Sequence, residues 1–115
     1  MTSNHIETIC YDGNKIIFTE KQWQIKCLKR PELREEGILL RIKGVLEKPD
    51  FVYKDLAGSD RLVYYKCEYS VNGRNRYLKV VISTEKIPYS VITAYRPDYV
   101  KERDKTELVY GQDTN

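Results

Sequence analysis

Lysine, arginine and tyrosine are concentrated in one stretch of this chain, residues 61–96. That stretch holds seven basic and two acidic residues, whereas residues 1–60 are balanced in charge. Among the tyrosines interleaved with these cations are Tyr64, Tyr65, Tyr69, Tyr77 and Tyr95. Such a surface can neutralise phosphates and stack on bases, which is typical of nucleic-acid binding. Two plainer interpretations stay open: strand cations often only solubilise an edge, and tyrosine fits ordinary sheet packing.

A second group of cations lies nearer the N-terminus, within a segment that we expect to be helical. Lys26 stands three and four residues before Lys29 and Arg30, so all three side chains can share one helix face. Such a cluster is either a solvated surface or a site that faces a phosphate.

Other kinds of site find little support in the sequence. His5 is the only histidine, and the cysteines are odd in number and widely spaced, so neither a zinc site nor a disulfide framework is predicted. The motifs of phosphate-binding loops, serine hydrolases and zinc proteases are absent. No run approaches the roughly 18–20 apolar residues of a membrane span. We therefore predict a cytoplasmic protein with reduced thiols, no metal, no cofactor and no membrane partner.

Lysine, arginine, tyrosine and threonine suffice for one reaction class, the cleavage of RNA by attack of its own 2′-hydroxyl on the adjacent phosphorus. The substrate supplies the nucleophile, and the protein must align the attack and stabilise the added negative charge. A lysine crowded by other cations has a lowered pKa and can act as the base. The product would carry a 2′,3′-cyclic phosphate.

The elements that position these residues follow from hydrophobic period and turn signals. At 115 residues and 13.6 kDa the chain has the length of one domain. We expect a short β-hairpin over His5–Tyr11 and Lys15–Phe18, helices over about 19–30 and 32–48, and strands over 51–54, 61–71, 76–83 and 89–96. The predicted fold class is α+β, with two N-terminal helices packed on one face of a four-stranded antiparallel sheet. Residues 1–100 would form this domain and 101–115 a polar C-terminal tail.

Alternation along the strands predicts which side chains face the helices. Leu78, Val80 and Ile82 form one apolar set and are expected in the core, together with Val63, Cys67, Ile92 and Ala94. The opposite, open face would then form a groove that contains Tyr64, Lys66, Lys79, Thr93 and Tyr95. An error of one residue in the register of a strand would invert its contribution.

Several segments, in this order, resemble a known family of nucleases. They are Ile17-Phe18-Thr19, Lys21-Gln22-Trp23, Lys29-Arg30-Pro31-Glu32-Leu33, Leu46-Glu47-Lys48-Pro49-Asp50, Val63-Tyr64-Tyr65, Leu78-Lys79-Val80-Val81 and Val91-Ile92-Thr93-Ala94-Tyr95. Together they cover about residues 16–97 and are similar to the barnase, EndoU, colicin and RelE-like superfamily of phage and toxin nucleases. The resemblance implies metal-independent endoribonuclease activity. The family's acid/base histidine is missing from Lys26–Pro31, so either lysine replaces it or the protein only binds.

The sequence thus predicts a ribonuclease with RNA as its partner. The expected catalytic residues are Lys26, Arg30, Lys66, Lys79, Thr93 and Tyr95, and the expected RNA-binding residues are Lys29, Tyr64, Tyr77 and Arg96. An acidic inhibitor or immunity protein is a further expected partner, because it would have to cover the same cationic groove. The alternative is a catalytically silent module of the same fold that binds RNA or a protein.

Overall fold

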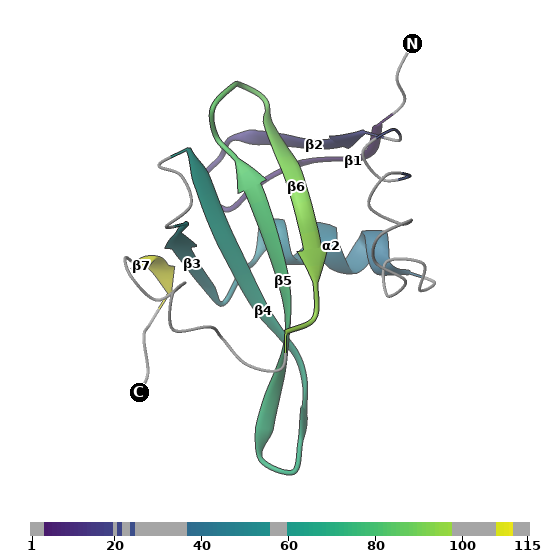
Figure 1. Cartoon of the computed structure of the whole chain (residues 1–115), viewed down its shortest axis with the longest axis vertical. Helices are drawn as coiled ribbons and strands as arrows, with labels where there is room; N and C mark the ends of the chain where they lie inside the picture. Colours follow the sequence, from purple (N-terminus) through teal and green to yellow (C-terminus); the bar gives the residue numbers. More distant parts are fainter. Residues whose placement is uncertain are drawn as a thin grey trace.

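A computed structural model describes residues 4–19, 21, 24, 37–55, 60–97 and 108–111 of the chain, without the side chains of 4–6. Its elements are β1 (Asn4–Ile9), β2 (Lys15–Thr19), α2 (Ile38–Glu47), β3 (Phe51–Lys54), β4 (Arg61–Val71), β5 (Arg74–Ser83), β6 (Tyr89–Tyr95) and β7 (Leu108–Gly111). Figure 1 shows α2 behind the sheet, and the β4–β5 hairpin extending well beyond it.

The seven strands of the described part all belong to one mixed sheet. Its order is β1-β2-β6-β5-β4-β3-β7, with β2 and β6 parallel and every other neighbouring pair antiparallel. The β4, β5 and β6 strands form the consecutive antiparallel meander that the turn signals predict, and β3 pairs antiparallel with β4 beside it. The N-terminal hairpin then joins this meander through the parallel pairing of Ile16 and Ile17 with Tyr89 and Ser90.

The predicted fold class is wrong, because the sheet has seven strands and is mixed rather than four-stranded and antiparallel. The parallel pairing joins segments that lie more than 70 residues apart in sequence, and no local pattern signals it. Within the range predicted to be a polar tail, Leu108–Gly111 forms β7 and pairs with β3. Of the first predicted helix, Lys21 and Gln24 are helical and the other residues from 20 to 30 lie outside the described part.

Local signals located most of the other elements. The predicted bounds of β3 and β4 agree with the structure, and the predicted N-terminal hairpin is confirmed. The turn between β4 and β5 has positive φ angles of 51° at Asn72 and 78° at Gly73, the conformation that an Asn-Gly hairpin turn requires. The described part of the second predicted helix is α2, which follows Gly37 and ends before Pro49.

The main core lies between α2 and one face of the sheet, which we call the α2 face. The helix buries Ile38, Ile42, Val45 and Leu46, which recur at the spacing of a single helix face. The strands contribute the following buried side chains to the same cluster: Ile16, Phe18, Val52, Tyr64, Leu78, Val80, Ile82, Val91 and Ala94. The predicted orientation of Leu78, Val80 and Ile82 toward the helix is therefore confirmed.

The opposite face of the sheet, which we call the far face, is also packed. Tyr53, Val63, Tyr65 and Val81 are buried there, with Phe51, Tyr77, Ile92 and Leu108 beside them. The predicted orientation of β4 was inverted, because Tyr64 belongs to the α2 face and Val63 to the far face. The sequence reasoning assumed one open face. With three consecutive buried residues, Val63, Tyr64 and Tyr65, alternation in β4 no longer distinguishes the faces.

A bulge changes the orientation of β6 part-way along the strand. Val81 pairs with Thr93 whereas Ile82 pairs with Val91, so one extra residue lies in β6. Val91 therefore joins the main core, whereas Ile92, which was predicted to lie there, packs against the far-face cluster. Beyond the bulge, Ala94 lies in the main core as predicted.

Candidate functional site

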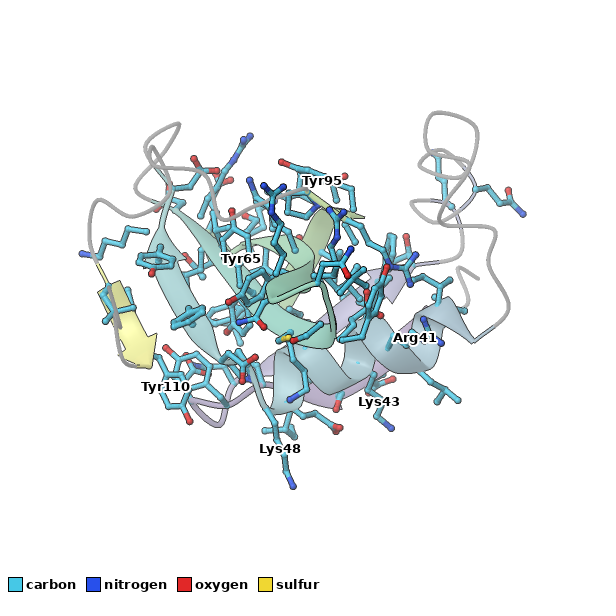
Figure 2. The ribbon with its side chains drawn as sticks, turned by 90° about the horizontal axis from the view of Figure 1, so that it is seen from below. Arg41, Lys43, Lys48, Tyr65, Tyr95 and Tyr110 are labelled. Atoms are coloured by element: carbon cyan, nitrogen blue, oxygen red, sulfur yellow. The ribbon has the colours of Figure 1, made fainter. Side chains whose placement is uncertain are left out.

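Lys79 and Tyr95, two of the predicted catalytic residues, meet on the far face. They are partners in the β5–β6 ladder, and the Lys79 ammonium donates to the Tyr95 hydroxyl at 2.9 Å. The ammonium also lies 5.7 Å from the ring centre of Tyr65 and 5.1 Å from that of Tyr95. Figure 2 shows Tyr65 and Tyr95 on the side of the sheet away from α2. Lys79 is only 3% exposed, so this cation is part of the packing rather than of an open groove.

The other predicted far-face residues surround this pair. Thr93 lies on the same face through its pairing with Val81, and its buried hydroxyl has no hydrogen-bond partner among the residues that the structure describes. Tyr77 is half-buried and packs edge-on against Tyr65, with 6.1 Å between ring centres. The far face thus brings together Lys79, Thr93, Tyr95 and Tyr77 from the prediction.

Lys66 lies on the opposite side of the sheet from Lys79. Its ammonium donates at 2.7 Å to the backbone carbonyl of Lys48, the residue that ends α2. A cation at that position satisfies a free carbonyl and lies favourably at the negative end of the helix dipole. The geometry accounts for Lys66 as a helix cap and separates it from the far-face group.

Tyr64 is fully buried under α2 and does not line a surface. Its ring packs edge-on against Tyr11 at 5.6 Å between ring centres, and its hydroxyl lies beside the Cys10 thiol. Burial raises the pKa of the Tyr64 phenol far above its usual range. The neighbouring Cys10 is also buried, which raises its thiol pKa, and it donates to Asp12 at 2.7 Å. The Tyr64 phenol and the Cys10 thiol therefore stay neutral at physiological pH, and both side chains belong to the main core.

Arg96, the residue after β6, binds the carboxylate of Glu68 on β4. Its Nε lies 2.6 Å from Oε1 of Glu68, and its second guanidinium nitrogen lies 3.3 Å from Oε2. Arg41 of α2 approaches the same Oε2 at 3.4 Å. Glu68 therefore links β4, β6 and α2. It lies within the β4 bulge between Cys67 and Tyr69, where the neighbouring Cys67 amide donates to the Asp50 carboxylate at 2.7 Å.

Two pockets open on either side of Tyr69, where the β4–β5 hairpin leaves the sheet. The first, about 360 Å³, is lined by Arg41, Gly44, Val45, Lys66, Cys67, Glu68 and Tyr69. The second, about 280 Å³, is lined by Tyr69, Val71, Arg76, Tyr77, Arg96 and Pro97. Tyr69 is 51% exposed and is the one residue common to both linings. We call this pair of hollows the Tyr69 pockets.

The sequence prediction found only part of this arrangement. Tyr77 and Arg96 were expected at a binding surface, and both line the second pocket. Tyr69, Arg76, Arg41 and Glu68 were not selected, although Tyr69 and Arg76 belong to the basic, tyrosine-rich stretch. Their strand partnership across the hairpin could have been inferred from the Asn-Gly turn. The predicted helix cations Lys26, Lys29 and Arg30 lie outside the described residues.

Neither a metal centre nor a membrane segment is found in the described part of the chain. No group of three or more potential ligands among its histidines, cysteines and carboxylates is placed to hold a metal ion. No described helix is long and apolar enough to cross a membrane.

Comparison with known proteins gives no relative for this chain. No family model matches the sequence, no curated protein matches it, and no solved structure matches its fold. The similarity to the nuclease superfamily therefore stays a hypothesis, and the functional argument depends on the geometry of the chain itself.

Proposed function

We propose that the protein binds single-stranded RNA, with bases in the Tyr69 pockets and phosphates against the arginines that line them. The observation that carries this proposal is the half-exposed ring of Tyr69, which forms a common wall between two arginine-lined hollows. Successive bases stack on aromatic rings in single-strand sites, while arginines follow the backbone. The rest of the basic stretch would add a positive field that attracts RNA.

The second pocket has the composition that such a site needs. Tyr69 and Tyr77 supply flat apolar surfaces, and Arg76 and Arg96 supply planar cations that can stack on a base or bind a phosphate. Val71, 44% exposed, continues the apolar surface toward the hairpin turn. A paired duplex hides its base faces in the stack, so this arrangement favours unpaired nucleotides.

Removing the Tyr69 ring, which lines both pockets, is the direct test. Tyr69→Ala should raise the Kd for a fluorescein-labelled oligouridine about tenfold, because one stacked base is worth about 1–3 kcal/mol. Fluorescence anisotropy at fixed salt measures this change. Tyr69→Phe keeps the ring and should bind like the parent protein.

Tyr110→Ala is the matched control, because Tyr110 is a similarly exposed strand tyrosine, 43% exposed, that lines neither pocket. Equal affinity of Tyr69→Ala and the parent protein would reject the proposal. Binding to an acidic protein without salt-sensitive binding to RNA would favour a protein partner.

Cleavage of RNA is a second candidate, favoured by one specific contact. The Lys79 ammonium, 2.9 Å from the Tyr95 hydroxyl, pairs a proton donor with a phenol, but Lys79 is 3% exposed, so cleavage requires a phosphate to reach this buried pair. Lys66 on the other face cannot act in the same site. Incubation of total RNA with the protein and EDTA should yield 2′,3′-cyclic phosphate ends if this candidate holds. Binding without fragments would exclude it.

A further inference from the structure

Two guanidinium groups from different elements converge on one carboxylate oxygen. Oε2 of Glu68 lies 3.4 Å from the nearest nitrogen of Arg41 and 3.3 Å from a nitrogen of Arg96. Arg41 comes from α2 and Arg96 follows β6, so neither is positioned by the other's backbone. The side chain of Glu68 is 11% exposed and that of Arg96 is 22% exposed, whereas that of Arg41 is 50% exposed. The contact between Glu68 and Arg96 is thus largely shielded from solvent, and the contact with Arg41 is open to it.

Two guanidinium groups that approach the same oxygen carry like charges. A shared anionic acceptor offsets their repulsion and forms charge-assisted hydrogen bonds with both. A planar arginine fork suits a phosphate as well as a carboxylate. Any anion that takes the place of the Glu68 carboxylate would meet both guanidinium groups.

The position of this contact relates it to the Tyr69 pockets. Arg41 and Glu68 line the first pocket, Arg96 lines the second, and Tyr69, the next residue after Glu68, separates the two. A phosphodiester that joins a base in one pocket to a base in the other must pass this point of the chain. The carboxylate of Glu68 stands where that phosphate would meet arginine.

We propose that Arg41 and Arg96 form a phosphate subsite which the carboxylate of Glu68 fills, so that Glu68 competes with a bound phosphate and sets the affinity of the site. That the phosphate belongs to RNA rests on the function proposed above; the subsite itself rests on the geometry of the three side chains. The competition makes binding selective, since a ligand must displace Glu68 and fill the pockets at the same time.

The test compares Glu68→Gln with Glu7→Gln. Both changes remove one carboxylate, but Glu7 pairs with Lys15 at the β1 edge of the sheet, with β2, β6 and β5 between it and β4. Titration with inorganic phosphate, followed by NMR of the arginine Nε–H groups, should show at least fivefold tighter binding for Glu68→Gln than for Glu7→Gln. Adding Arg41→Gln to Glu68→Gln should remove this gain. The Kd for oligouridine should fall at least threefold in Glu68→Gln alone.

Equal phosphate affinity of Glu68→Gln and Glu7→Gln would overturn the proposal, and so would weaker binding by Glu68→Gln. If Glu68→Gln does not fold, Glu68→Asp replaces it, because the shorter side chain keeps the charge but withdraws it from both arginines. Glu68→Asp should then show the same direction of change, and its absence would equally reject the subsite. Tighter phosphate binding without RNA binding by any variant would reject the proposed function and leave the subsite standing.

Discussion

The two faces of the central sheet are both packed, but with different chemistry. The α2 face is covered by aliphatic side chains around Ile42, with Lys66 at its rim capping the helix. The far face is built largely from tyrosine rings, and Lys79 lies buried among them. The two lysines were predicted to share one groove. Their separation shows two ways in which a cation on a central strand can be part of the packing. Lys66 donates to the backbone carbonyl at the end of a helix, and Lys79 lies against aromatic rings.

The largest expected effect is on the α2 face. Ile42 is fully buried at the centre of the helix, so Ile42→Ala should lower the free energy of unfolding by about 3 kcal/mol through lost burial and a remaining cavity. Leu40 lies on the same helix but is 75% exposed, so Leu40→Ala is the matched control and should change it by less than about 0.5 kcal/mol. Urea unfolding followed by far-UV circular dichroism measures both. Similar losses for the two variants would mean that α2 does not pack by the described face.

A smaller effect is expected on the far face. Tyr95→Phe removes the hydroxyl that accepts from Lys79, and a hydrogen bond to a buried charged group is worth about 1.5–3 kcal/mol. Tyr77→Phe removes an exposed hydroxyl that accepts from Asn75 at 3.3 Å, and should change stability by less than about 0.5 kcal/mol. The same urea titration compares them. If Tyr95→Phe were as mild as Tyr77→Phe, Lys79 would not depend on Tyr95 and the contrast between the faces would lose its main support.

The sequence predicts local elements of this fold better than their assembly. Three kinds of element follow from residues close together in the sequence. They are the turns at Asp12-Gly13 and Asn72-Gly73, the apolar stripe of α2, and the strand Arg61–Val71. The parallel pairing of β2 with β6 and the addition of β7 depend on distant segments, which turn chemistry does not specify. Both pairings widen the sheet, and the ring of Tyr11 reaches Tyr110 of β7 at 4.5 Å between ring centres.

The candidate site was harder to predict than the fold for a related reason. A basic, tyrosine-rich stretch indicates that cations and rings will be close, but the bulges at Cys67 and in β6 decide which face each side chain takes. The placement of Lys79 and Tyr95 on the same face was predicted correctly, because the β5–β6 bulge lies beyond them, between Val81 and Ile82. Glu68 was missed because an acid in a basic stretch carries no signal until its arginine partners are placed in space.

The smallest expected effect concerns Lys66 at the rim of the α2 face. Lys66→Met keeps the length and apolar stem of the side chain but leaves the Lys48 carbonyl without its donor, so the free energy of unfolding should fall by about 1 kcal/mol. Lys86→Met, in the exposed connection between β5 and β6, removes the same charge and should change it by less than about 0.3 kcal/mol. Hydrogen exchange adds a local measure, because amides in the last turn of α2 should lose protection in Lys66→Met alone. A different outcome would contradict the helix-cap role: Lys66→Met leaves stability and protection unchanged but weakens RNA binding more than Lys86→Met does. Lys66 would then act at the first Tyr69 pocket, and the contrast drawn above between Lys66 and Lys79 as packing cations would fail.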